Sequence, residues 1–241
     1  MVLDLRLSKD CGCRETTLLF FCQKNECKTF LIQLFFVLLQ SLIVILKRLV
    51  VWTNEDMVEA VRVLESGGLI LYPTDTVWGI GCDATQSEAV ARIYRLKERE
   101  DSKSMLVLVA DEAQLRTVTE ESEAVYAQAA LLNRDERPTT IIYSHARGVA
   151  ENLIAEDGSI GIRLSREGFS QELCRRLGRP IVSTSANISG KQTAKCFEQI
   201  EEVIRRGVDY ICLYRRDDRK EYEPSRIVKI KDDGTYITIR P

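Results

Sequence analysis

Residues 67–81 read GGLILYPTDTVWGIG, an apolar run that passes directly into a polar turn. The run predicts a strand over Leu69–Tyr72, and Pro73 ends it because proline has no N–H to donate to a sheet. Ligands of open α/β sheets commonly bind where strands end. The hydroxyls of Thr74 and Thr76 and the nearby glycines would allow close backbone approach to a ligand, but the same residues also suit an ordinary tight turn.

Helix signals lie on both sides of this stretch. Thr53 or Asn54 can cap a first helix, whose apolar residues fall at helical spacing and which stops at the glycine pair. Thr85 and Glu88 match a capping box, which predicts the start of a second helix with lysine and arginine at its end.

The chain beyond the second helix alternates between short apolar strands and helices. Asp233-Gly234 is a turn signal that predicts a hairpin near the C-terminus. The mixed order predicts an α/β fold, with a single domain built on an open, twisted, mixed sheet with flanking helices. We expect the remaining strands over 105–109, 140–143, 160–164, 181–183, 225–230 and 236–239, and the remaining helices over 170–177 and 196–206.

The composition suits a chain that buries a full core. The chain has 241 residues, of which 45% are hydrophobic, and a formal net charge of -2. This charge gives no overall attraction to a polyanion, so any phosphate binding must be local. The eight cysteines would suit a disulfide scaffold only in a much shorter chain. Four crowd near the N-terminus without the paired C-x-x-C spacing of zinc modules, and the others indicate reduced core thiols.

Residues 1–52 form an N-terminal extension that differs sharply from the domain predicted over residues 53–241. Its apolar run from Thr29 to Leu46 lies at the lower edge of the length that spans a bilayer. Three interpretations compete: a membrane-associated anchor helix, a helix packed on the domain, and upstream sequence translated from a start codon that is not the real one. We favour the third, because the remainder is self-sufficient. No small-residue cleavage site follows the run to indicate a secretory signal.

Two further polar clusters lie where predicted elements end. Lys97, Arg99 and Lys103 place three cations close together, which is favourable when a polyphosphate binds but is also typical of a solvated helix end. Residues 183–191, STSANISGK, directly follow an apolar strand and can present hydroxyl and amide groups to phosphate or carboxylate oxygens. This run is not a P-loop, because it lacks the earlier glycine and has glutamine after its lysine.

Other reaction classes find little support in the sequence. The only histidine, His145, has no nucleophile motif beside it, so we expect a structural or surface role for it. No Gly-x-Gly-x-x-Gly pattern opens a helix, which argues against dinucleotide binding.

Together, these motifs strongly resemble the YrdC/TsaC family of threonylcarbamoyl-AMP synthases, in the short form that has the YrdC-like domain alone. The resemblance covers the chain from about residue 54 to the C-terminus. The matching motifs are PTDTVWG at 73–79, Lys97-x-Arg99, PTT at 138–140, SIGIR at 159–163, Ser185-x-Asn187 and Pro224-Ser225.

The resemblance implies a basic concave cleft in which a nucleotidyltransferase reaction joins ATP, L-threonine and bicarbonate to give threonylcarbamoyl-AMP and pyrophosphate. ATP is then a substrate that arrives with Mg²⁺, and no tightly bound protein-ligated metal is implied. The product would serve the threonylcarbamoyladenosine modification of tRNA in the cytoplasm, through a downstream tRNA threonylcarbamoyl-transferase complex.

The resemblance also implies roles for particular side chains. Lys97 and Arg99 match the catalytic cations. The positions that match ATP-binding residues are Lys97, Arg99, Lys103, Thr140, Ser159, Ser185, Asn187, Thr193 and Arg240. The positions that match threonine-binding residues are Thr76, Arg163, Ser183 and Ser225.

The chain departs from the family pattern at three positions. Many relatives have proline where this chain has Glu100, some have histidine near Leu108, and tyrosine is common in place of Trp78. The alternative function is a non-enzymatic module of the same fold that binds double-stranded RNA. The chain keeps the lysine–arginine and serine–asparagine signatures that some branches of the family lack, and this favours the enzyme.

Overall fold

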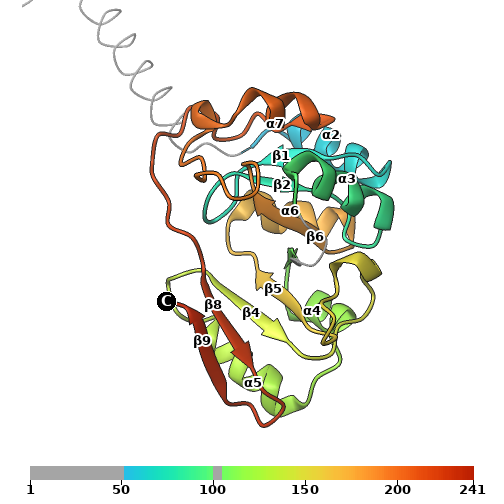
Figure 1. Cartoon of the computed structure of the whole chain (residues 1–241), viewed down its shortest axis with the longest axis vertical. Coiled ribbons are helices and arrows are strands. Elements are labelled where there is room, and N and C mark those ends of the chain that lie inside the picture. The colour runs from blue at the N-terminus through green and yellow to red at the C-terminus, as the bar shows by residue number, and fades with distance from the viewer. Residues whose placement is uncertain (1–51, 100–104) are drawn as a thin grey trace, which may run out of the picture. The chain divides into compact units, whose positions relative to one another are not determined.

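A mixed sheet runs through the computed structural model, which describes residues 52–99 and 105–241. Its strands are β1 Ile70–Tyr72, β2 Gly79–Gly81, β3 Leu106–Val109, β4 Thr139–Tyr143, β5 Ile160–Leu164, β6 Ile181–Ser185, β7 Tyr210–Ile211, β8 Arg226–Ile230 and β9 Tyr236–Arg240. Their order is β7-β1-β2-β6-β3-β5-β4-β8-β9, so the sheet is open at β7 and β9. Figure 1 shows the hairpin of β8 and β9 far from β1 and β2. The pairs β1–β7, β3–β5 and β4–β8 are parallel.

Helices pack on both faces of this sheet. They belong to the same compact unit as the strands, which spans residues 50–241. The helices are α2 Asn54–Glu65, α3 Ser87–Lys97, α4 Glu112–Val118, α5 Glu123–Leu132, α6 Gly168–Leu177 and α7 Glu202–Gly207, with single 3-10 turns at Glu151–Leu153 and Phe197–Gln199.

Alternating side chains of the strands fill two hydrophobic cores. Leu71 in β1 belongs to the larger core, where α3 and α5 pack, whereas Tyr72 belongs to the smaller core beneath α2 and α6. In β5, Ile162 belongs to the larger core, so its neighbour Arg163 points to the opposite face. Among the described residues, none from β4, β5, β8 or β9 lies in the smaller core. The polar side chains on that face of these strands are therefore available to form a site.

The predicted fold class and most predicted elements are confirmed. Thr53 caps α2 as expected, because its hydroxyl accepts from the N–H of Asp56 at 3.2 Å. The hairpin of β8 and β9 turns at Gly234, whose φ of 81° lies in the left-handed region that favours glycine. Strand β5 has the bounds that the sequence predicts.

The predicted capping box at Thr85 and Glu88 is wrong. Helix α3 begins at Ser87, and no side chain caps its first turn. Thr85 lies one residue before the N-cap Gln86, in a turn where its N–H and its hydroxyl both donate to Asp83 Oδ1, at 2.9 and 2.7 Å. Short polar side chains commonly make such local bonds in place of a cap.

The predicted helix over 196–206 is wrong as a single element. A 3-10 turn and the short α7 replace it, and Ile200 between them is extended and buried. Strands β2 and β7 and helices α4 and α5 were not predicted. β2 has only three residues, two of them glycine, so its composition resembles that of a turn.

Residues 1–51 of the N-terminal extension lie outside the described residues, together with its apolar run and its cysteines. Lys103 and Glu100 lie outside them as well. Within the described ranges, no helix is both long and apolar enough to cross a bilayer.

Candidate functional site

Tyr72, the last residue of β1, lies across the glycines of β2. A Cβ atom at Gly81 would lie 2.7 Å from Tyr72 Cε1, and one at Gly79 would lie 3.2 Å from Ser183 Oγ. The Tyr72 hydroxyl reaches the carbonyl of Val182 at 3.5 Å, and burial raises the pKa of its phenol. The glycines therefore accommodate a tyrosine ring within a strand and do not form a tight turn.

The turn after β1 holds two threonine hydroxyls inside the protein. The Thr74 hydroxyl donates to the carbonyl of Val77 at 2.8 Å, and its oxygen accepts from the N–H of Thr76 at 3.1 Å. The two hydroxyl oxygens are 3.1 Å apart. Because Thr74 already uses its hydrogen on Val77, the Thr76 hydroxyl donates to Thr74 and keeps its lone pairs for a ligand.

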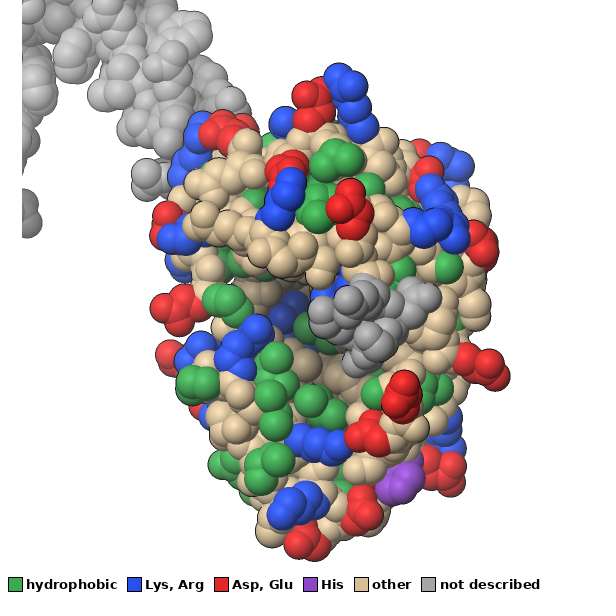
Figure 2. Space-filling view, viewed as in Figure 1, with side chains coloured by type: hydrophobic (Ala, Val, Ile, Leu, Met, Phe, Trp, Pro, Cys, Tyr) green, Lys and Arg blue, Asp and Glu red, His purple; other side chains and the backbone are tan. Residues whose placement is uncertain are grey.

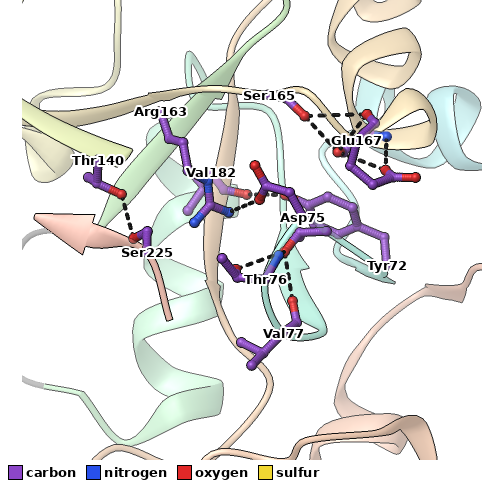
Figure 3. Close-up of polar contacts among 12 residues, drawn as sticks. Tyr72, Asp75, Thr76, Val77, Thr140, Arg163, Ser165, Glu167, Val182 and Ser225 are labelled. Atoms are coloured by element: carbon purple, nitrogen blue, oxygen red, sulfur yellow. Dashed lines mark hydrogen bonds and ion pairs between the residues drawn. The ribbon is translucent and has the colours of Figure 1, made fainter. Parts of the chain in front are cut away.

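Arg163 and Asp75 form a buried ion pair beside this turn (Figure 3). Arg163 Nη2 lies 3.0 Å from Asp75 Oδ1, and the two side chains are 4% and 10% exposed. Among the described residues, no hydrogen-bond partner aligns with Arg163 Nε or with either oxygen of Asp75. Unsatisfied polar atoms in a buried place are costly unless something completes their hydrogen bonds.

A second polar group joins β4 to the C-terminal hairpin. Thr140 Oγ1 and Ser225 Oγ are 2.8 Å apart, and both side chains are buried. The Arg240 guanidinium donates to the carbonyl of Ser225 at 2.8 and 3.0 Å. The antiparallel register of β4 and β5 places Thr140 beside Arg163. Four of the predicted site residues therefore lie together on the open face of the sheet, namely Thr140, Arg163, Ser225 and Arg240.

Guanidinium groups make this end of the site positive. Burial, followed by the charges of Arg137 and Arg163, lowers the pKa of Arg240. Arg137 and Arg163 are therefore both close enough to Arg240 to repel it. An anionic ligand would relieve that repulsion, and guanidinium groups bind carboxylate and phosphate with paired hydrogen bonds.

Lys97, the last residue of α3, is 1% exposed. Its ammonium donates to the carbonyls of Ser185 and Asn187, the second at 2.6 Å. The N–H of Ser189 donates to the carbonyl of Lys97 at 2.8 Å. Burial and the nearby Arg99 lower the pKa of Lys97 to about 7. The lysine–arginine and serine–asparagine signatures are therefore parts of one bonded unit.

Asn187 shapes the loop that Lys97 holds. Its side-chain amide donates to the carbonyls of Ile188 and Lys191 at 2.8 and 2.9 Å. Its Oδ1 atom is buried, and no described residue bonds to it. This oxygen can accept a hydrogen bond from a ligand.

Two other predicted site residues, Arg99 and Ser159, lie next to the ends of α3 and β5. Arg99 follows Glu98, whose φ of 49° turns the chain away from α3. Ser159 lies at the opposite end of β5 from Arg163, and its hydroxyl donates to Asp157 at 2.5 Å.

Thr193 is half-buried in the loop after β6. No hydrogen bond within the described part of the chain joins its side chain to the other site residues. The structure therefore does not connect Thr193 to the bonded unit of Lys97.

Figure 2 shows a hollow in the middle of the described surface, with Lys and Arg side chains inside it. Arg215 lies at a neighbouring pocket and donates to the carbonyl of Thr74 at 3.0 Å and to Asp218 at 3.0 Å. Its φ of 59° is strained for a non-glycine residue. The pocket is lined by Pro73, Thr74, Thr76, Val77, Trp78, Lys195, Arg215, Asp218, Lys220 and Tyr222.

A group that could ligate a metal lies apart from this site. Ligand atoms of Glu121, His145 and Asp232 lie within 4.8 Å of one another. His145 Nδ1 is 3.1 Å from Glu121 Oε2, and this contact raises the pKa of the exposed His145. The histidine thus has an ion-pair partner at the surface.

Sequence reasoning missed three residues that shape the site. Asp75 and Tyr72 lie within residues 67–81, but nothing in the local sequence indicates that Asp75 contacts β5 and that Tyr72 contacts β6. Arg215 lies in a segment of mixed charge that resembles an ordinary surface loop. Alternating burial along β4 and β5 could have suggested that an acid faces Arg163, since a buried arginine needs a partner.

A protein-family model described as telomere recombination, Sua5_yciO_yrdC, matches residues 62–241. The chain belongs to the Sua5/YciO/YrdC family. The predicted resemblance is thereby confirmed.

Curated relatives carry one enzyme name. A threonylcarbamoyl-AMP synthase from Stenotrophomonas maltophilia is 37% identical over 153 residues, which cover 63% of this chain and 82% of the relative. A protein of the same name from Idiomarina loihiensis is 32% identical over 157 residues, which cover 65% of this chain and 84% of the relative.

Solved structures share the fold. E. coli YciO has a TM-score of 0.67 and 25% identity, over 78% of this chain and 89% of that protein. P. abyssi Sua5, in a complex with L-threonine, has a TM-score of 0.65 and 23% identity, over 77% of this chain and 53% of that protein. At this identity, the likeness to Sua5 concerns the fold alone.

Proposed function

We propose that this chain is an L-threonylcarbamoyladenylate synthase, a nucleotidyltransferase that converts ATP, L-threonine and bicarbonate into threonylcarbamoyl-AMP and pyrophosphate. The observation that carries the proposal is the buried Arg163, whose Nε atom lacks a hydrogen-bond partner in the described structure. It lies beside the hydroxyls of Thr76 and Thr140, in a family whose curated relatives have this name.

The chemistry of this reaction suits such a site. The threonine amine and bicarbonate give a carbamate, whose oxygen attacks the α-phosphorus of ATP while the bond to pyrophosphate breaks. No protein nucleophile is needed, so catalysis depends on orientation and on neutralising negative charge. Aligned hydroxyls can orient the carbamate, and guanidinium groups can neutralise the phosphates.

Each substrate would have its own set of residues, and the bonded group of Thr140, Ser225 and Arg240 would serve both. Arg163, with Thr76, Ser183 and Ser225, would take the threonine carboxylate and hydroxyl. The nucleotide would lie toward the loop of Asn187. The residues proposed for ATP are Lys97, Arg99, Lys103, Thr140, Ser159, Ser185, Asn187, Thr193 and Arg240.

We assign two modes of action to the residues proposed for ATP. Arg99 and Lys103 would contact the triphosphate directly, because guanidinium and ammonium groups suit phosphate oxygens. Lys97 would act mainly by shaping the loop, because its ammonium already donates to two carbonyls.

The setting of the reaction is part of the same proposal. Magnesium would enter with ATP, as the resemblance to the family implies. The product would pass to a tRNA threonylcarbamoyl-transferase complex in the cytoplasm. Binding of tRNA or double-stranded RNA stays a separate prediction, which a gel-shift titration of the purified chain would test.

The test follows pyrophosphate release from ATP by the purified chain. We expect release only when L-threonine and bicarbonate are both present, and much less with L-serine, L-valine or no amino acid. Release of phosphate without pyrophosphate, or a rate indifferent to threonine, would contradict the proposal.

A further inference from the structure

Asp75 is a buried carboxylate with unused hydrogen-bonding capacity. Its side chain is 10% exposed, and within the described ranges its charged contact is Arg163 Nη2, 3.0 Å from Oδ1. Neither oxygen has an aligned hydrogen-bond donor among the described residues. A carboxylate can accept about four hydrogen bonds. Its free acceptor sites therefore call for a donor that the described protein does not supply.

The partner of Asp75 has the complementary deficiency. Arg163 Nε has no hydrogen-bond partner among the described residues, although the side chain is buried. The pair thus offers an unfilled donor and unfilled acceptors side by side. A ligand that carries a carboxylate next to an amine satisfies both, because its carboxylate bonds the guanidinium while its N–H groups bond Asp75.

The surrounding charge explains why an acid is needed there. Arg240, whose guanidinium donates to the carbonyl of Ser225, lies near Arg163 and Arg137. Such a cationic set attracts the carboxylate of an amino acid but repels its ammonium group. A carboxylate beside Arg163 attracts the ammonium group of the amino acid. The bound zwitterion is therefore oriented with its carboxylate toward the guanidinium and its ammonium group toward the acid.

We propose that Asp75 recognises the amine of the amino-acid substrate whose carboxylate binds Arg163. The proposal rests on the proposed function, since it assigns a residue to the same threonine site. Two other roles make different predictions. Asp75 could only hold Arg163 in place, or it could occupy the guanidinium and compete with the substrate carboxylate.

Binding measurements with two ligands separate these roles. L-Threonine and (R)-3-hydroxybutanoate share the carboxylate and the hydroxyl, but the second lacks the amine. We expect wild-type protein to prefer threonine in isothermal titration calorimetry. Asp75→Asn should weaken threonine binding about ten- to hundredfold and leave 3-hydroxybutanoate within about twofold. Asp217→Asn, which removes an exposed negative charge outside the site, should change neither affinity.

Each remaining outcome contradicts the proposal. Equal weakening of both ligands by Asp75→Asn would show that Asp75 only positions Arg163, and tighter binding of both would show that it competes. A wild-type protein without preference between the ligands would exclude amine recognition. If wild type binds neither ligand, the proposed function fails as well, whereas threonine binding that Asp75→Asn leaves unchanged overturns this inference alone.

A conservative variant protects the test against misfolding. Thermal unfolding monitored by circular dichroism should show that Asp75→Asn is folded. If it is not, Asp75→Glu keeps the charge and should keep the preference for threonine over 3-hydroxybutanoate. Loss of that preference in folded Asp75→Glu, with 3-hydroxybutanoate binding intact, would count against charge recognition by this residue.

Discussion

Lys97 connects two motifs that lie far apart in the sequence. Its ammonium donates to carbonyls 88 and 90 residues away. A buried lysine is costly unless its hydrogens meet acceptors, and backbone carbonyls supply them here. The contact fixes the loop after β6 to the end of α3. In the proposed function, we expect Lys97 to act on nucleotide binding through the shape of this loop.

Replacing Lys97 with methionine tests the contact between its ammonium and the loop after β6. We expect Lys97→Met to lower the free energy of unfolding by about 1–3 kcal/mol, because it leaves buried carbonyls without a donor. It should also raise the ATP concentration needed for pyrophosphate release, because the loop loses its fixed shape. Urea denaturation and an ATP titration give the two quantities.

Lys191→Met is the matched control for this prediction. Lys191 lies in the same loop but is exposed, and it pairs with Glu201 at the surface. We expect its stability to stay within about 0.5 kcal/mol of wild type. A higher ATP requirement in Lys97→Met with unchanged stability would show that Lys97 acts on the phosphates directly.

Arg163 provides the second prediction at this scale. Arg163→Lys keeps the charge but loses the planar fork that binds a carboxylate. We expect the threonine concentration for half-maximal activity to rise about ten- to hundredfold, while the ATP requirement changes far less. Separate titrations of the two substrates check this. Equal shifts for both, or no shift for either, would show that Arg163 does not anchor the carboxylate.

Single residues were predictable where a short motif carries the chemistry. Thr76, Thr140, Arg163 and Ser225 were all expected in the site, and the structure brings them together. The bonding of Lys97 could not be predicted, because it depends on how two distant segments meet. For the same reason, the sequence indicated cations near a polyphosphate but not a lysine held against backbone carbonyls.

Strand β2 shows why one element escaped prediction. Its glycines leave room for the ring of Tyr72, so its composition follows a packing need and not the propensity of a strand. The elements that were predicted had local signals, such as the Thr53 cap of α2 and the Asp233-Gly234 turn of the hairpin. The capping box at Thr85 failed because Asp83 holds Thr85 in the turn before the helix, which begins only at Ser87.

Gly81→Ala tests the packing of β2. A Cβ atom there would lie 2.7 Å from Tyr72 Cε1 and 2.8 Å from the carbonyl of Val182, so the ring must move. We expect a loss of about 1–3 kcal/mol in the free energy of unfolding, as for other overpacked cores.

Gly161→Ala is the matched control for Gly81→Ala. It also adds a methyl group to a strand, but the nearest atom would be 3.5 Å away, an ordinary contact. Urea denaturation of both variants measures the difference. Equal stability of the two would contradict the role given to the Tyr72 ring.

At the scale of the whole molecule, uneven coverage of the sheet by helices places the site. The smaller core under α2 and α6 draws its strand residues from β1, β3 and β6 and, among the described residues, none from the far strands. The same face of β4 and β5 therefore carries Thr140 and Arg163. Sequence patterns predicted an open mixed sheet but not its strand order, because pairing partners are set by contacts between distant segments.

The division of the chain at about residue 52 remains a prediction. Every candidate site residue lies after it, and residues 50–241 form one compact unit. We expect a protein without residues 1–51 to keep the pyrophosphate release rate and the unfolding midpoint of the full chain. Truncated protein that is inactive or insoluble, beside an active full chain, would show that the extension contributes to the domain.

The most direct test of the proposed synthase reaction supplies the chain with ATP, L-threonine and carbon-13-labelled bicarbonate and analyses the products by mass spectrometry. The proposed reaction predicts a nucleotide with the mass of threonylcarbamoyl-AMP that carries the label, formed together with pyrophosphate and absent when any one substrate is omitted. Unlabelled AMP as the only nucleotide product, or ADP with phosphate, would contradict it.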